Sequence, residues 1–156
     1  MSSRSSDIVI RRLGADDLAS MRGVNELFAV VFDEQGTYAD KPPSDAYLLS
    51  RLADETFVCV AAFDDERVVG ALAGFVLRKF EQERSEIYVY DLAVAETHRR
   101  RGIATALIED VRRIARECGS WVVFIQADEG DEPPIRLYSK LGTREDAVHF
   151  DIDPHD

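Results

Sequence analysis

A basic loop of this chain, residues 99–104, has the composition of an anion-binding site. It reads Arg99-Arg100-Arg101-Gly102-Ile103-Ala104 and follows the apolar residues 92–94. A helix that begins at Gly102 leaves its first backbone N–H groups unpaired and directs the positive end of its dipole toward a ligand. Glycine allows the backbone to approach that ligand closely, and arginine side chains suit a pyrophosphate. The loop is therefore predicted to bind an anion.

Hydrophobic periodicity predicts the elements that position this loop. Residues 86–94 are apolar enough for a central strand, and residues 121–125 have the composition of another. Between them, the apolar residues of segment 103–118 fall on one face of a helix. A strand, a helix and a strand in this order form a βαβ unit, so the two strands should be parallel.

The rest of the chain supplies further elements on both sides of that unit. We expect strands at residues 8–13, 56–63, 68–77 and 147–152, helices at residues 18–32, 43–52 and 135–141, and a loop at residues 35–38. This order predicts an α/β (α+β) fold in which helices flank a mixed central sheet. Residues 1–6 should form a flexible tail, and residues 7–154 a single domain.

Composition and charge exclude several classes of protein. The 156 residues include no apolar window long enough to span a bilayer, and the polar N-terminus lacks the core of a signal peptide. We therefore expect a cytoplasmic protein without a membrane partner. The net charge of −11 argues against nucleic acid and is compatible with a cationic substrate, although charge alone favours a role in solubility.

Cysteine and histidine give no sign of a metal site. The two cysteines and three histidines lack metal-ligand spacing, so we expect no metal. We expect Cys59 and Cys118 to be buried, reduced thiols, because Cys59 lies in an apolar segment and Cys118 near the end of a helix.

Three features together resemble the GNAT superfamily of N-acetyltransferases, over nearly the whole chain. They are the order of elements, the Arg99-x-x-Gly102-x-Ala104 loop after residues 91–94, and a later Leu137-Tyr138-x-x-Leu141-Gly142. Residues 69–73, 79–82, 84–94 and 149–154 look more specifically like the gentamicin-modifying aminoglycoside 3-N-acetyltransferases. The resemblance implies the GNAT fold, acetyl-coenzyme A as donor, and the 3-amino group of a gentamicin- or sisomicin-like aminoglycoside as acceptor.

The resemblance also implies where the donor binds. Backbone groups of residues 92–94 would hold the pantetheine arm much as a neighbouring strand does, and the N–H groups of residues 101–105 would hold the pyrophosphate. The expected donor-binding residues are Leu92, Ala93, Val94, Arg99, Arg100, Arg101, Gly102, Ile103, Ala104 and Thr105.

Two residues are expected to transfer protons. Asp91 is a lone carboxylate in an apolar strand, and we favour it as the general base, acting directly or through water. The competing interpretation is a structural carboxylate that pairs with a cation or caps a backbone group. Tyr138 is the candidate general acid toward the departing thiolate, and its competing interpretation is a tyrosine that packs on the sheet.

An aminoglycoside carries several positive charges and needs carboxylates around it. The candidate acceptor-binding residues are Glu86, Tyr90, Asp128, Glu129, Asp131, Asp151 and Asp153, and Tyr38 and Phe80 are candidate apolar walls. For any single acidic residue, surface solvation is an equally good explanation. A homodimer through the C-terminal strand is expected from the resemblance alone.

Two other functions remain open. The same fold and donor could serve a polyamine, another small amine or a protein amine, all of which suit an acidic pocket. Alternatively, the chain could bind coenzyme A without catalysis. The presence of both Asp91 and Tyr138 argues against that second function, because a binding module needs neither.

Overall fold

The computed structural model describes residues 7–156, and the tail expected at residues 1–6 lies outside them. The chain divides into two compact units, Met1–Gln126 and Ala127–Asp156. The described part of the first, the larger unit, contains the β-sheet and the helices that cover it. The second, the C-terminal unit, contains α5 (Glu132–Leu141). No helix among residues 7–156 is both long and apolar enough to cross a membrane.

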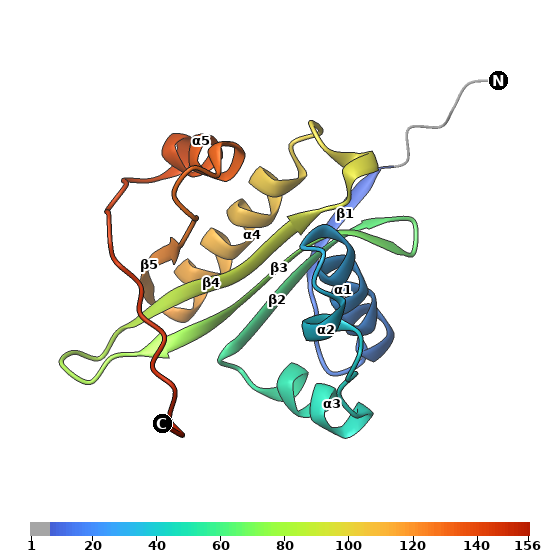
Figure 1. The fold of residues 1–156 in the computed structure, drawn as a ribbon, viewed down its shortest axis with the longest axis horizontal. Helices are drawn as coiled ribbons and strands as arrows, with labels where there is room; N and C mark the ends of the chain where they lie inside the picture. The colour runs from blue at the N-terminus through green and yellow to red at the C-terminus, as the bar shows by residue number, and fades with distance from the viewer. Residues whose placement is uncertain (1–6) are drawn as a thin grey trace. The chain divides into compact units, whose positions relative to one another are not determined.

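In the larger unit, five described strands form one mixed sheet in chain order (Figure 1). They are β1 (Ile8–Arg12), β2 (Phe57–Asp64), β3 (Arg67–Arg78), β4 (Ser85–Val94) and β5 (Ser120–Ile125). Neighbours from β1 to β4 are antiparallel, whereas β4 and β5 are parallel. Because a helix connects the parallel pair, the expected βαβ unit is confirmed, and so is the α/β fold with a mixed central sheet.

Helices cover both faces of the sheet (Figure 1). On one face lie α1 (Leu18–Val31), α2 (Gln35–Tyr38) and α3 (Asp45–Ala53), and on the other lies α4 (Ile103–Cys118). Phe28 of α1 and Leu48 of α3 are buried in one cluster with Cys59 and Ala71 of the sheet. This burial of apolar side chains on each face is the main source of stability for a layered fold.

The start of α4 lies close to the sheet, beside the end of β4. A Cβ atom on Gly70 of β3 would lie 2.9 Å from Ile103 Cγ2, so a larger residue there would force the Ile103 side chain at the start of α4 to shift. Gly70 is also opposite Val94 in the sheet register. The first turn of α4 therefore lies near the last residues of β4, although a loop with a short 3₁₀ helix, η1 (Glu96–His98), separates them in sequence.

Three expectations about local structure are wrong. Residues 35–38, expected as a loop, form α2, because the N–H groups of Tyr38 and Ala39 bond back to Glu34 and Gln35. Cys118, expected to be buried, is exposed in the last turn of α4 before Gly119 ends the helix. The third concerns the strand expected at residues 147–152, which is absent.

Residues 143–150 have no regular secondary structure. Val148, Phe150 and Ile152 alternate as a strand requires, yet they are 80%, 79% and 86% exposed. Alternation is a local property, whereas a strand exists only when another strand accepts and donates its hydrogen bonds. Within the described chain no strand pairs with this segment.

Candidate active site

Pairing between β4 and β5 covers only the first half of β4. The register runs from Ser85 opposite Ser120 to Val89 opposite Ile125 and stops there. Among the described strands, none borders the far side of β4 beyond that point, where residues 92–94 lie. An exposed strand edge of this kind can pair with an extended ligand.

The arginine loop, residues 99–102, leads directly into α4. Gly102 adopts the left-handed conformation, with φ of +75°, and a Cβ there would meet no atom within 4 Å. No side chain caps the helix, and Ala106 N–H donates to the Gly102 carbonyl at 3.0 Å. The N–H groups of residues 103–105 precede this bond, so they have no acceptor within the helix. These open donors fit a phosphate.

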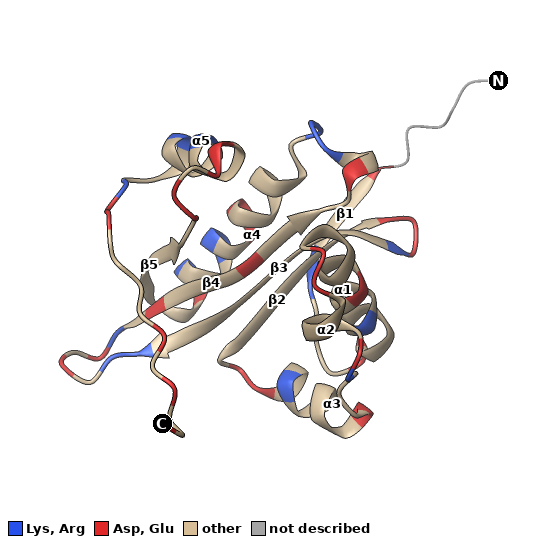
Figure 2. Cartoon of the chain, in the orientation of Figure 1, with Lys and Arg blue, Asp and Glu red and all other residues tan. Residues whose placement is uncertain are grey.

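The side chains of the arginine loop add three positive charges at this helix end. Arg99, Arg100 and Arg101 are all exposed. Figure 2 shows basic residues gathered in the loop before α4. Together with the open N–H groups, they supply the donors and the charge that a pyrophosphate requires.

A buried histidine that sequence reasoning missed fastens the arginine loop. His98 Nε2 lies 2.7 Å from Asp64 Oδ2, and His98 Nδ1 lies 2.8 Å from Thr97 Oγ1. The histidine is 8% exposed. Because Asp64 ends β2, this contact ties the loop to the sheet. The sequence offered one signal of this contact, a histidine directly before the arginines, because Asp64 lies far from it in the chain.

A β-bulge in β4 sets the direction of Asp91. Val89 lies opposite Gly74 of β3 and Asp91 lies opposite Ala73, so Tyr90 is an extra residue in the ladder. A Cβ on Gly74 would lie 2.4 Å from the Tyr88 carbonyl oxygen, which only glycine tolerates. An extra residue reverses the alternation of side chains along a strand. The bulge therefore turns Asp91 to the sheet face that α1 and α2 cover.

Asp91 is half-buried, and its partner is a phenol. Tyr38 Oη donates to Asp91 Oδ2 at 3.1 Å. Burial raises the pKa of Asp91 above its usual range, the hydrogen bond from Tyr38 opposes this, and the negative charge of Glu34 adds to the rise. No ion pair holds this carboxylate among residues 7–156. The structure therefore gives no support to a purely structural pairing with a cation.

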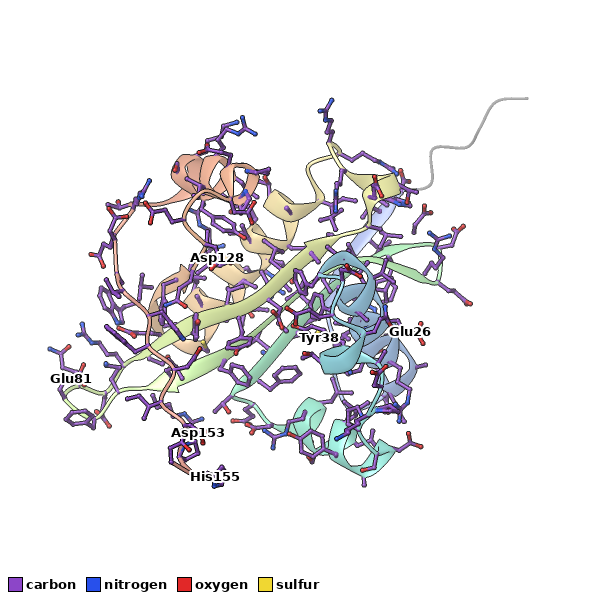
Figure 3. The ribbon with its side chains drawn as sticks, in the orientation of Figure 1. Glu26, Tyr38, Glu81, Asp128, Asp153 and His155 are labelled. Carbon is purple, nitrogen blue, oxygen red and sulfur yellow. The ribbon has the colours of Figure 1, made fainter. Side chains whose placement is uncertain are left out.

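Two aromatic rings hold Tyr38 in place, one from α1 and one from the residue that caps the C-terminal end of α1. The ring centroid of Tyr38 lies 5.8 Å from that of Phe28 and 5.8 Å from that of Phe32. The side chain of Tyr38, labelled in Figure 3, points from α2 toward the sheet. Sequence reasoning expected an apolar wall here, whereas the structure brings the hydroxyl to Asp91. The other expected wall, Phe80, is 99% exposed in the β3–β4 connection.

Aromatic side chains continue along the sheet from Asp91. Tyr90 packs edge-on against Phe75 and Tyr88, with centroids 6.4 Å and 5.8 Å apart, and Tyr88 stacks on Phe124 at 4.8 Å. Tyr90 is 64% exposed. Of the expected acceptor-binding residues, Glu86 and Tyr90 therefore lie on β4 with Asp91, and Glu86 is half-buried.

The remaining candidates belong to the C-terminal unit. Tyr138 of α5 is half-buried, and burial together with Asp131 raises its pKa to about 12. Exposed acidic residues of this unit include Asp128, Glu129, Asp131, Asp151 and Asp153. Asp151 Oδ1 lies 2.9 Å from His149 Nε2, and Asp153 accepts from the His155 N–H at 2.8 Å. Their roles toward a substrate stay predictions.

Comparison with known proteins relates most of this chain to one family. Residues 23–143 match the sequence model of the Acetyltransferase (GNAT) family. The crystal structure of an aminoglycoside acetyltransferase, HMB0005, from an uncultured soil metagenomic sample is 46% identical and has a TM-score of 0.92, covering 94% of this chain and 98% of that one.

Two further relatives differ in what their names say of the acceptor. The aminoglycoside acetyltransferase meta-AAC0020, from an uncultured soil metagenomic sample and solved in complex with sisomicin, is 29% identical with a TM-score of 0.87, covering 94% of this chain and 95% of that one. An N-alpha-acetyltransferase of Sulfurisphaera tokodaii is 30% identical over 62% of this chain. The chain spans between 37% and 68% of the length of the curated relatives it matches.

Proposed function

We propose that this chain, which belongs to the Acetyltransferase (GNAT) family, transfers an acetyl group from acetyl-coenzyme A to the 3-amino group of a gentamicin- or sisomicin-like aminoglycoside. The observation that carries the proposal is Asp91, a half-buried carboxylate with a raised pKa at the point where β4 leaves β5. The likeness to two aminoglycoside acetyltransferases supports the choice of acceptor.

The donor-binding residues are those of the arginine loop and the open edge of β4. N–H groups of residues 101–105, with the side chains of Arg99 and Arg100, would hold the pyrophosphate, and residues 92–94 would hold the pantetheine arm. When bound, acetyl-coenzyme A supplies the acetyl group as an activated thioester. The room in front of Gly102 supports this assignment, because a ligand oxygen can approach the backbone there.

Asp91 acts as general base in this proposal. An amine attacks only after it loses its proton, and a carboxylate whose pKa is raised toward neutrality is a better acceptor for that proton. Asp91 Oδ2 is engaged by Tyr38, which leaves Oδ1 to receive the proton. Tyr138 holds a proton on its phenol oxygen, since burial raises its pKa to about 12, and is the proposed donor to the leaving thiolate.

Acceptor recognition in this proposal rests on carboxylates and one aromatic side chain. Glu86 and Tyr90 would contribute from β4, and Asp128, Glu129, Asp131, Asp151 and Asp153 from the C-terminal unit. Exposed Tyr90 offers the flat surface on which the apolar face of an amino sugar packs, and ammonium groups are attracted to aromatic faces. A homodimer through residues 147–152 is part of the same proposal.

The test is a thiol-release assay. The protein is mixed with acetyl-coenzyme A and gentamicin or sisomicin, and the free coenzyme A is measured with a colorimetric thiol reagent. NMR of the product identifies the acetylated nitrogen. We expect acetylation of the 3-amino group, a large loss of turnover in Asp91→Asn, and normal turnover in the matched surface variant Glu109→Gln. Acetylation at another nitrogen would overturn the regiospecificity, and no release with any aminoglycoside would overturn the acceptor class.

A second candidate acceptor is an amine of a peptide or polyamine. The similarity to an N-alpha-acetyltransferase favours it, and the acidic composition suits any cationic amine. The same assay separates the two, because release with spermidine or with short peptides, but not with gentamicin, supports this alternative.

A further inference from the structure

The hydroxyl of Tyr38 and the carboxylate of Asp91 are in contact although the two residues are far apart in the sequence. Tyr38 ends α2, Asp91 lies in the second half of β4, and the hydrogen bond between them is 3.1 Å long. The rings of Phe28 and Phe32 fix the tyrosine ring from α1 and its end. The phenol therefore reaches the carboxylate from a held position rather than from a free side chain.

Asp91 has one engaged oxygen and one open oxygen. Tyr38 donates to Oδ2, and within residues 7–156 no hydrogen bond to Oδ1 is formed. The titratable groups around this carboxylate are Glu34 before α2, Tyr38 in α2, and Tyr90 and Tyr88 on β4. From β3, apolar Ala73 lies opposite. Tyr38 is the neighbour that donates to Asp91, whereas Glu34 repels its negative charge.

We propose that Tyr38 is a positioning residue that fixes the Asp91 carboxylate, keeps it ionised despite its burial, and leaves Oδ1 directed at the amine of the acceptor. The proposal rests on the proposed function only in naming that amine. A hydrogen bond donated to a carboxylate favours its charged form, and a fixed orientation saves the cost of ordering the base in each turnover. Tyr38 itself stays neutral, because burial and Asp91 raise its pKa.

The test compares three variants by their pH profiles of kcat/KM. Tyr38→Phe removes the hydroxyl but keeps the ring, so the acid limb should move to higher pH, and turnover at the plateau should fall about tenfold. Glu34→Gln removes a negative charge, so its acid limb should move to lower pH. Tyr47→Phe removes the same hydroxyl from an exposed tyrosine of α3, away from Asp91, so its acid limb should stay at the wild-type pH.

The same contact can be measured without any acceptor. In protein labelled with ¹³C at aspartate carboxyl carbons, Asp91→Asn identifies the Asp91 resonance, and its titration is followed in the wild type and in Tyr38→Phe. We expect the Tyr38→Phe midpoint at higher pH. This measurement distinguishes the two proposals, because a protein inactive on aminoglycosides would refute the proposed acceptor while the titration still tests the contact.

Two outcomes would overturn the positioning role. One is an Asp91 titration and an acid limb that are unchanged in Tyr38→Phe. The other is an equal movement of the acid limb in Tyr38→Phe and Tyr47→Phe, which would indicate that the shift does not depend on the contact with Asp91. Circular dichroism of each variant verifies that the comparison is made on folded protein.

Discussion

His98 Nε2 lies 2.7 Å from Asp64 Oδ2, so the residue that precedes the arginine loop is fastened to the end of β2. The imidazole is buried, and its other nitrogen lies 2.8 Å from Thr97 Oγ1. A second contact holds the same segment, since Ala95 N–H donates to the Val69 carbonyl at 2.8 Å. The segment that leads into the arginine loop is therefore anchored to the sheet before any ligand binds, which lowers the entropy cost of binding.

Removing this attachment should weaken donor binding. In Asp64→Ala, the buried Nε2 of His98 loses its partner while Nδ1 keeps Thr97, and leaving a buried polar atom unpaired costs about 1–3 kcal/mol. We expect KM for acetyl-coenzyme A to rise about tenfold in steady-state assays, with KM for the amine unchanged. Glu66→Ala, in the turn between β2 and β3, is the matched control. Equal KM values in both variants would contradict the role given to His98.

Gly102 and Gly119 provide a matched pair at the two ends of α4. Both are left-handed, with φ of +75° and +78°, and a Cβ at either meets no atom within 4 Å. Alanine at either position should lower the free energy of unfolding by about 1 kcal/mol, because the left-handed conformation disfavours a side chain. Urea unfolding measures this loss.

Donor binding should separate the two glycine variants. We expect Gly102→Ala to raise KM for acetyl-coenzyme A, since its methyl group occupies the space in front of the open N–H groups. Gly119→Ala should leave that KM at the wild-type value. A normal KM in Gly102→Ala would argue that the pyrophosphate binds elsewhere.

The bulge opposite Gly74 should be sensitive to any added atom. A Cβ there would lie 2.4 Å from the Tyr88 carbonyl oxygen, which is part of the backbone and cannot move alone. Gly74→Ala should cost about 2–3 kcal/mol in unfolding experiments. Its remaining folded fraction should have little turnover, because Asp91 lies just past the bulge. Gly14→Ala is the control, since a Cβ there lies 4.0 Å from its nearest atom.

Asp91 should reduce the stability of the folded protein at neutral pH. Burial raises its pKa in the folded state, so the folded protein holds the proton more tightly than the unfolded chain. Stability is then lost as pH rises from the ordinary pKa of an aspartate through the raised value. Asp91→Asn should therefore be more stable than the wild type at pH 7, by about 1 kcal/mol. A gain of this size is typical when a destabilising active-site residue is replaced.

The difference in the free energy of unfolding between Asp91→Asn and the wild type is best tested by its dependence on pH. Urea unfolding at a series of pH values should show the advantage of Asp91→Asn shrinking as pH falls, because the wild-type carboxyl becomes neutral. An advantage that is constant with pH would mean that the substitution acts through packing and not through the charge. Glu109→Gln, on the exposed face of α4, should show neither effect.

Local patterns in the sequence were sufficient for the central βαβ unit and the arginine loop. The apolar periodicity of residues 103–118 and the glycine before them determine where α4 begins and which face it buries. Asp91 could also be singled out as a candidate, because a carboxylate in an apolar strand is conspicuous in any register. Each of these features depends on residues that are near one another in the chain.

Tertiary structure alone decided the rest. Tyr38 meets Asp91 and His98 meets Asp64 only because strand register and helix packing bring distant segments together. The bulge at Tyr90 depends on a glycine in the neighbouring strand. The alternating residues 147–152 show the converse, since their pattern is that of a strand but no described strand pairs with them. Sequence periodicity determines which face a segment can bury, whereas a partner at hydrogen-bonding distance determines whether it does so.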